Sequence, residues 1–443
     1  MKALAKKEVV FISFMLFSMF FGAGNLIFPP FLGQASGEKV WLALAGFIVS
    51  ATGLPILGVA AVAKAGSFQE LASRVHPWFA LLFPFLIYVS IGPGLAIPRA
   101  GSLAFEMGPG QFIPETLSMQ LALFGYTIIF FSIVLWLSLS PSKLVDRFGK
   151  LLTPFLLFLI AVIFVKSLFA PMGAFETAQG NYDKNPVFQG FLDGYLTMDA
   201  LASLVFGIVV ANTIRAKGVV DEKYVSRYII LAGIGAGALL STIYMILGYL
   251  GAASAFLGKA ENGAQVLSNF MNHLFGQGGT ILLGIVFTVA CLSVSIGLVT
   301  SCSQFFNRII PRISYKMWAL LLCVLSMVVA NLGLTQILKV SVPILGAIYP
   351  IALVLIILGL IHPYIKGYSS VYITAVLFVS AFSIADMINT TFLANRWSNV
   401  LQLIPLYEKG VGWLVPAVAG IVLGYVYGMR FLPEEKEKKR KVA

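Results

Sequence analysis

Residues 9–31 read VVFISFMLFSMFFGAGNLIFPPF, an apolar run with two glycines and an asparagine near its middle. About 20 apolar residues in a helix cross the roughly 30 Å hydrocarbon core of a membrane, so this run is long enough to span it. Glycine costs about 1 kcal/mol in a helix interior relative to alanine, and here Gly22 and Gly24 flank Ala23 just before Asn25. The run therefore predicts a membrane helix that unwinds near its centre, although close packing of the glycines against a neighbouring helix would explain the same residues.

The composition agrees with lipid as the main solvent of the chain. Of its 443 residues, 59% are hydrophobic and only 11% are charged, whereas a soluble domain has roughly 25% charged residues. Helices satisfy their own backbone hydrogen bonds in lipid, and the runs are too long and too uniformly apolar for barrel strands. No small-residue cleavage site follows a short apolar core at the N-terminus, so we expect the first run to be a retained membrane helix.

The length of a membrane span divides the sequence into twelve predicted helices. They cover residues 9–31, 40–63, 78–98, 119–139, 151–170, 188–214, 228–252, 279–305, 318–334, 340–361, 371–392 and 411–429. We expect an all-α integral membrane protein whose two ends lie on one side of the membrane.

The formal net charge of +12 is a topology signal rather than a nucleic-acid footprint. Most of the 30 lysines and arginines fall in loops on the side of the termini, and the opposite side receives a scattered few, among them Arg99 and Lys339. Because basic loops stay in the cytoplasm, both termini are predicted to be cytoplasmic. The three cysteines and three histidines show no metal-ligand spacing and no catalytic set is visible, so we expect no enzyme, no catalytic residue and no nucleic-acid partner.

A second interruption is predicted at residues 194–199, GYLTMD, inside the sixth segment. A carboxylate at membrane depth costs about 3 kcal/mol or more, so Asp199 marks a function or a buried partner. The alternative is that the helix begins after Asp199, which would then be a loop residue. Five helices separate the starts of the two interrupted segments, and an odd number of helices inverts the second unit relative to the first. This is the inverted-repeat plan of secondary transporters, whose broken helices meet near the membrane midplane.

Polar residues in other segments fit a central cavity between the broken helices. The third segment contains Tyr88 before an irregular Ser90–Gly94 stretch, and the eighth contains Ser293 and Thr300 on one helical face. Hydroxyl oxygens suit a hard cation, although serines and threonines in helices often bond back to their own backbone. Asp386 lies outside the ten-helix unit, so we interpret it as structural or interfacial.

These stretches resemble the branched-chain amino acid:cation symporters, the BrnQ family. The resemblance is carried by SMFFGAGNLIFPP at residues 18–30, SIGP at 90–93 with AIPR at 96–99, GYLTMDALA at 194–202, and ACLS at 290–293 with IGL at 296–298. It implies the LeuT-like fold of the amino acid–polyamine–cation superfamily. The implied arrangement is a first five-helix repeat at residues 1–170, an extracellular connection at 171–187, a second, inverted repeat at 188–362, helices eleven and twelve at 363–430, and a charged cytoplasmic tail at 431–443.

The resemblance also implies how a substrate is held. It places the substrate carboxylate on the amides of Gly22, Ala23, Gly24 and Asn25, with Tyr88 as a further donor. It places the substrate ammonium at Leu196, Thr197, Met198 and Asp199. The apolar side chain of the substrate would lie against Ile91 and Phe206. A sodium ion would contact the carbonyls of Ser18, Phe21 and Ala290 and the hydroxyl of Ser293. Val294 stands where many relatives carry a second hydroxyl, which leaves Na⁺ and H⁺ open as the coupling ion.

The expected function is import of leucine, isoleucine and valine by alternating access, driven by Na⁺ or H⁺ across a bacterial plasma membrane. The expected partners are a small amino acid substrate and the lipid bilayer, with no obligate protein partner and no cofactor besides the coupling ion. The alternatives are a permease of the same fold for another amphipathic solute, such as an aromatic amino acid or a nucleobase, and an ion channel.

Overall fold

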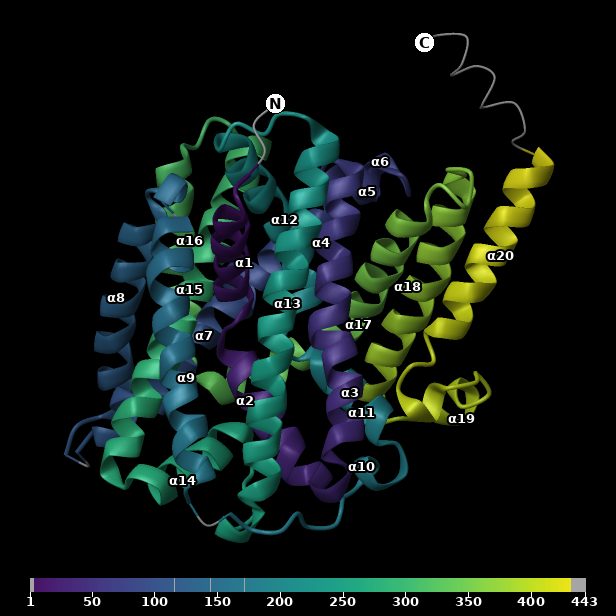
Figure 1. Cartoon of the computed structure of the whole chain (residues 1–443). Helices are drawn as coiled ribbons and strands as arrows, with labels where there is room; N and C mark the ends of the chain where they lie inside the picture. The colour runs from purple at the N-terminus through teal and green to yellow at the C-terminus, as the bar shows by residue number, and fades with distance from the viewer. Residues whose placement is uncertain (1–3, 115, 144, 171, 432–443) are drawn as a thin grey trace.

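The computed structural model describes residues 4–114, 116–143, 145–170 and 172–431. Within these ranges the chain is helical without strands, and ten of its helical stretches are long and apolar enough to cross a membrane. The start of the first helix and the end of the last helix lie on the same side of the bundle (Figure 1). The prediction of an all-α membrane protein is confirmed, whereas the count of twelve spans stays a prediction.

The helices occupy the following residues. The α-helices are α1 Lys6–Phe20, α2 Ala23–Ser36, α3 Val40–Ile48, α4 Leu54–Ala65, α5 Phe68–Ser73, α6 Pro77–Val89, α7 Ala96–Met107, α8 Met119–Ser138, α9 Thr153–Leu168, α10 Asn181–Lys184, α11 Pro186–Tyr195, α12 Asp199–Ala216, α13 Glu222–Ala253, α14 Gly263–Phe275, α15 Gln277–Ile309, α16 Tyr315–Ala330, α17 Leu334–Ile361, α18 Ser369–Thr391, α19 Ser398–Leu401 and α20 Leu414–Phe431. Short 3₁₀ or π segments are η1 Gly37–Lys39, η2 Val49–Gly53, η3 Ser90–Gly94, η4 Pro109–Phe112, η5 Pro141–Lys143, η6 Val145–Leu152, η7 Ala255–Leu257 and η8 Tyr407–Lys409.

The first predicted span is broken at its glycines. Helix α1 ends at Phe20, Phe21 and Gly22 are extended, and α2 begins at Ala23. A methyl group on Gly22 would lie 2.7 Å from a methyl carbon of Val294, so this glycine also permits close packing against α15. Unwinding and close packing therefore occur together at this position.

The sixth span is broken as well, between the end of α11 at Tyr195 and the start of α12 at Asp199. Met198 has a left-handed backbone with φ of 67°, a conformation that non-glycine residues adopt rarely. The left-handed conformation of this residue separates α11 from α12, so that α12 begins as a new helix.

The third span is longer than predicted, because the chain stays helical beyond Pro98. The π-helical segment η3 joins α6 to α7, and Gly92 within it leaves helical geometry with φ −83° and ψ −122°. Pro98 lies in the first turn of α7, where its missing N–H removes no intrahelical bond. The assignment of Arg99 to an outer loop is therefore wrong, since this residue lies inside α7. Lys339, also assigned to a loop, lies inside α17.

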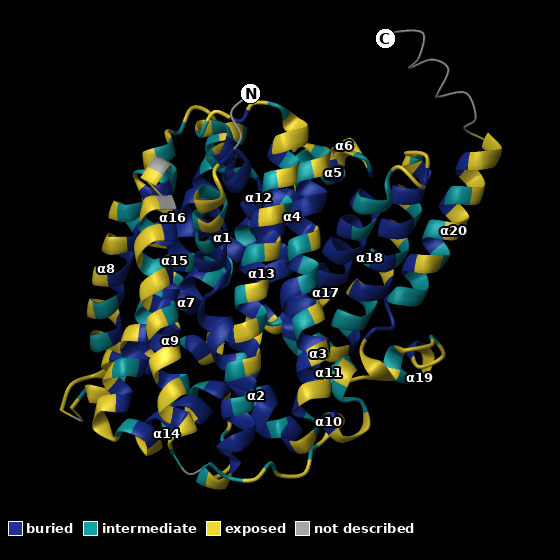
Figure 2. Cartoon of the chain, in the orientation of Figure 1, coloured by how far each residue is buried: buried dark blue, intermediate teal, exposed yellow. Residues whose placement is uncertain are grey.

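The surface of the bundle is largely apolar, as expected for contact with lipid. On α8, Leu121, Ile129 and Trp136 are 66%, 62% and 69% exposed, and Figure 2 shows similar exposed positions along the outward side of α9 and α20. By contrast, α1 and α12 are mostly buried at the centre. The interrupted helices therefore lie where neighbouring helices, rather than lipid, cover their open backbone groups.

Helix α14 and the short helices α10 and α19 cover the face opposite the N-terminus and were not predicted (Figure 1). They lie in connections that were assigned as loops. The charged tail predicted at 431–443 lies outside the described residues apart from its first residue.

Candidate functional site

The two helix breaks meet at the centre of the bundle. The Nδ2 of Asn25, in the first turn of α2, donates to the Oδ2 of Asp199, the first residue of α12, at 2.5 Å. Asn25 is 1% exposed and Asp199 is 2% exposed. The prediction that the breaks come together is confirmed, and the alternative in which Asp199 belongs to a solvated loop is wrong.

Asn25 ties together three elements at this point. Its Oδ1 accepts the backbone N–H of Gly22 at 3.0 Å, and its Nδ2 also donates to the hydroxyl of Tyr244 on α13. Tyr244 in turn donates to the Asp199 carboxylate at 3.2 Å. A backbone amide can only donate, so the amide oxygen of Asn25 must face Gly22 and its nitrogen must face α12.

The ends of four half-helices supply partial charges around this junction. Helices α2 and α12 begin here and direct N-terminal amides toward the gap, whereas α1 and α11 end here with the negative ends of their dipoles. The Gly22 amide is already bonded to the Asn25 side chain, so the first-turn amides left for an anion are those of Ala23, Gly24 and Asn25. The junction can therefore bind an anionic group on one side and a cationic group on the other.

Arg99 is a further member of the site, contributed by α7. It is 4% exposed, its Nη1 donates to the Leu196 carbonyl at 2.9 Å, and its guanidinium lies 6.0 Å from the ring centre of Phe28. Its Nε has no hydrogen-bond partner. A methyl group on Gly24 would lie 3.0 Å from its Nη2, so glycine at this position lets the guanidinium approach α2 closely. A buried positive charge with spare donors is a strong anion ligand.

A small cavity lies between the two breaks, with Arg99 and Asp199 both in its wall. Its volume is about 30 Å³, room for one or two water molecules. The lining residues are Met19, Phe20, Gly22, Ala23, Gly24, Asn25, Ile91, Ala96, Arg99, Ala100, Thr197, Met198, Asp199, Ala202, Val294 and Leu298. A wall that combines a guanidinium and a carboxylate with aliphatic side chains suits a zwitterion with an apolar side chain.

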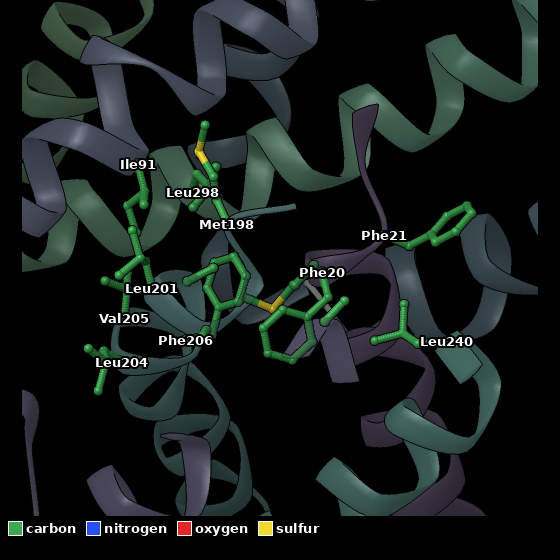
Figure 3. Packing of buried hydrophobic residues seen from close by; sticks show 14 of the residues in the cluster. Phe20, Phe21, Ile91, Met198, Leu201, Leu204, Val205, Phe206, Leu240 and Leu298 are labelled. Atoms are coloured by element: carbon green, nitrogen blue, oxygen red, sulfur yellow. The ribbon is translucent and has the colours of Figure 1, made fainter. Parts of the chain in front are cut away.

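The apolar wall partly matches the prediction. Ile91 lines the cavity, whereas Phe206 lies behind Phe20 with their ring centres 5.4 Å apart. Figure 3 shows these two rings together, with Ile91 and Leu298 nearby and Phe21 turned away from them. Phe20 is therefore the aromatic residue that faces the cavity.

Tyr88 does not lie in the cavity. Its ring stacks on Phe305 with centres 3.7 Å apart, and it lines a different small pocket together with Gln304 and Arg308. Leu196 is absent from the cavity wall, but its carbonyl holds Arg99. Gly22, Ala23, Gly24, Asn25, Thr197, Met198 and Asp199 all line the cavity as the sequence suggested.

The residues suggested for a cation lie where α1 packs against α15 and α9. The Ser18 hydroxyl is 2.5 Å from the Thr153 hydroxyl, which also donates to the Phe14 carbonyl at 2.7 Å. The Ser293 hydroxyl donates to the carbonyl of Val289 in its own helix at 2.9 Å. Phe21 and Ala290 are fully buried beside them. Thr153 is a hydroxyl that sequence reasoning missed.

Sequence reasoning also missed Arg99, Tyr244 and Phe20. The signal for Arg99 was present, because a lone arginine followed Pro98 in an otherwise apolar, small-residue stretch. Tyr244 lies in the long apolar helix α13 and is fully buried, so only the packing of α13 against α2 reveals its role.

Comparison with known proteins agrees with this architecture. The profile described as "Branched-chain amino acid transport protein" matches residues 5–430. The chain is 44% identical to the branched-chain amino acid permease BraB of Bacillus subtilis, over 98% of both chains. It is 40% identical to the branched-chain amino acid transport system 2 carrier protein of Pseudomonas aeruginosa, over 95% of both chains.

Solved structures with little sequence similarity share the fold. The transporter Mhp1, of the nucleobase-cation-symport-1 family, superposes with a TM-score of 0.63 at 12% identity, over 96% of this chain and 92% of that one. MhsT in complex with L-phenylalanine gives a TM-score of 0.60 at 15% identity, over 93% and 98%. The helical arrangement is therefore that of LeuT-like transporters. By its match along almost the whole sequence, the chain belongs to the branched-chain amino acid transport protein family, whose members are transporters and not enzymes.

Proposed function

We propose that this protein is a secondary active symporter that imports leucine, isoleucine and valine by alternating access. The observation that carries the proposal is the pair of opposite charges in the central cavity. Arg99 and Asp199 are both buried in its wall, and the guanidinium donates to a backbone carbonyl instead of the carboxylate. Burying charges is costly unless each finds a partner, and a zwitterion placed between them would partner both.

The orientation of the substrate follows from this charge distribution. Its carboxylate lies at Arg99 and the free amides of α2, where the guanidinium and the helix N-terminus both favour an anion. Its ammonium lies at Asp199. Its branched side chain then packs against Ile91 and Phe20, an apolar wall that favours an aliphatic group.

The present volume of about 30 Å³ is too small for a leucine, so the cavity must widen to admit one. Two inverted five-helix repeats that rock around the breaks supply this opening, with two further helices at the C-terminal end. In support, both breaks lie at the same junction and five predicted spans separate their starts. We propose twelve crossings in a bacterial plasma membrane with both termini in the cytoplasm, on the basis of the asymmetric distribution of lysine and arginine.

The coupling ion in this proposal is Na⁺ or H⁺, bound near the end of α1. The paired hydroxyls of Ser18 and Thr153 and the open carbonyls after Phe20 support a hard cation at this place. Val294 instead presents methyl groups to Gly22, which limits the oxygen ligands available from α15. Ion and substrate carboxylate would lie close together, so each would raise the affinity of the other by the same factor.

Uptake by the purified full-length protein in proteoliposomes tests the proposal. We expect saturable accumulation of radiolabelled leucine under an imposed Na⁺ or pH gradient, with competition by isoleucine and valine but not by phenylalanine or uracil. Equal uptake with and without each gradient would refute coupling, and stronger competition by phenylalanine or uracil would refute the substrate class.

A further inference from the structure

A second and larger cavity opens on the face opposite the N-terminus. It lies between α11, α17, α18 and the segment that connects α18 to α20 (Figure 1). Its volume is about 770 Å³, within the range of roughly 300–1,000 Å³ that is usual for small-molecule sites. It shares no lining residue with the central cavity, so it is a separate place in the molecule.

The roof of this outer cavity is built by specific side-chain contacts. The Oδ1 of Asn389 on α18 accepts the backbone N–H of Trp397 at 2.7 Å, and its Nδ2 donates to the Ser398 hydroxyl at 3.2 Å. The ammonium of Lys409 lies 5.0 Å from the ring centre of Phe188 on α11. The connecting segment is thereby fastened to α18 at one end and to α11 at the other.

The wall of the outer cavity carries unpaired polar groups. The Tyr195 hydroxyl, the Ser383 hydroxyl and the Trp413 indole N–H are buried without a hydrogen-bond partner, in side chains that are 8%, 3% and 4% exposed. The Trp413 N–H faces the Tyr195 hydroxyl without reaching hydrogen-bond geometry. Buried polar groups in native proteins are nearly always bonded. Tyr195 and Trp413 can partner each other, so the Ser383 hydroxyl is the group that indicates a polar ligand or water at this wall.

Three charged residues line the outer cavity, the carboxylates Asp386 and Glu408 and the ammonium of Lys409, so both signs are available to a ligand. Asp386 is half-buried and accepts one hydrogen bond, from Tyr407 at 2.8 Å, which leaves its other oxygen available. Lys409 is the only basic residue of this wall, and among the described residues it forms no salt bridge. Aromatic residues, among them Phe382 and Trp413, share the rest of the wall with amide and hydroxyl side chains. A carboxylate, an ammonium and an apolar aromatic surface together match a small amino acid zwitterion.

The outer cavity also borders on the central break. Tyr195, in its wall, is the last residue of α11, and its ring stacks on Tyr349 of α17 at 4.2 Å. The Tyr349 hydroxyl accepts the backbone N–H of Ala200, in the first turn of α12, at 3.3 Å. A ligand in the outer cavity would thus touch a residue that is packed directly against the second helix break.

We propose that the outer cavity is a second binding site for a small zwitterionic amino acid. Asp386 binds the ammonium, Lys409 binds the carboxylate, and the aromatic wall packs against the side chain. The inference rests on the proposed function in its choice of leucine as the ligand, and it adds a site that the central breaks do not contain.

Equilibrium binding of tritiated leucine to the full-length protein in detergent tests this inference by stoichiometry. We expect two leucines per chain in the native protein and one in Asp386→Asn and in Lys409→Gln. Lys409 is exposed in the connecting segment, so its substitution keeps the test decisive even if the Asp386 variant fails to fold. The matched control is Lys184→Gln, an exposed lysine of the same face outside the cavity wall, which should retain two.

Three results would overturn the inference. One leucine per chain in the native protein, unchanged in both variants, would remove the outer site and leave the proposed function intact. Two leucines in the native protein and in both variants would place the second leucine elsewhere. Absence of leucine binding to the native protein would refute both the outer site and the proposed function.

Discussion

Replacement of Asp199 by asparagine removes a negative charge from the junction of the two helix breaks with little change in shape. The carboxylate accepts hydrogen bonds from Asn25 at 2.5 Å and from Tyr244 at 3.2 Å, and we assign to it the substrate ammonium. A hydrogen bond to a charged group contributes about 1.5–3 kcal/mol. Because about 1.4 kcal/mol corresponds to a factor of ten, the KM for leucine should rise by roughly 10- to 150-fold.

The assay is the initial rate of leucine uptake in proteoliposomes at matched protein content. The control is Asp193→Asn, which changes a carboxylate of α11 that is bonded to Tyr182 and Gln189 and lines neither cavity. We expect its KM to stay within about twofold of the native value, well below the smallest change worked out for Asp199. A KM for Asp199→Asn that also stays within this margin would refute the assignment of the ammonium.

The same substitution leaves the buried charge of Arg99 uncompensated. Arg99 and Asp199 attract each other without direct contact, and a buried charge without a compensating one is costly, so the single variant should unfold at a lower temperature. The double variant Arg99→Gln with Asp199→Asn restores charge balance, so its thermal stability should recover, whereas leucine transport should fall further than in the single variant because both charged ligands are gone. A double variant with the native KM for leucine would contradict the account of both residues.

Three further predictions concern other parts of the bundle. The methyl group added in Gly33→Ala would lie 2.0 Å from the Gly248 carbonyl oxygen, so this variant should unfold at a clearly lower temperature. The control Gly278→Ala, which has open space around it, should unfold at the native temperature. Equal melting temperatures of the two variants would count against the packing of α2 on α13. Val294→Ser adds an oxygen beside Gly22 and should lower the Na⁺ concentration for half-maximal leucine uptake; an unchanged value would argue against a cation at this place. Burial, with a smaller contribution from the Arg74 charge, lowers the pKa of His362 below its ordinary value of 6.5. Just below pH 6.5 the unfolded chain therefore binds more protons than the folded one, so the stability of the fold should fall as the pH drops through 6.5. His362→Gln should flatten this dependence of stability on pH, and an equally steep dependence in the variant would refute the role of the histidine.

The sequence was informative wherever a residue type conflicts with its surroundings. Gly22 and Gly24 conflict with a continuous helix and Asp199 conflicts with lipid, and these conflicts lie at the two breaks. The apolar runs also predicted most helices to within a few residues, because the thickness of the membrane fixes the length of a span.

Residues whose role depends on packing between distant segments could not be predicted in the same way. Proline usually breaks a helix, so the third span was predicted to end at Pro98, which placed Arg99 outside the membrane. In the structure, Pro98 lies in the first turn of α7, where proline is tolerated. Tyr88 has the right chemistry for a substrate ligand, but it precedes the irregular turn of η3 and stacks on Phe305 instead. The outer cavity depends on a connecting segment folding back over α11, which no local pattern encodes.

A structure of the full-length protein determined with leucine bound tests the central claim most directly. The account predicts the leucine carboxylate at Arg99 and the free amides of α2, the ammonium at the Asp199 carboxylate, and the side chain against Ile91 and Phe20. Leucine bound away from both helix breaks, or with its carboxylate turned toward Asp199, would contradict it.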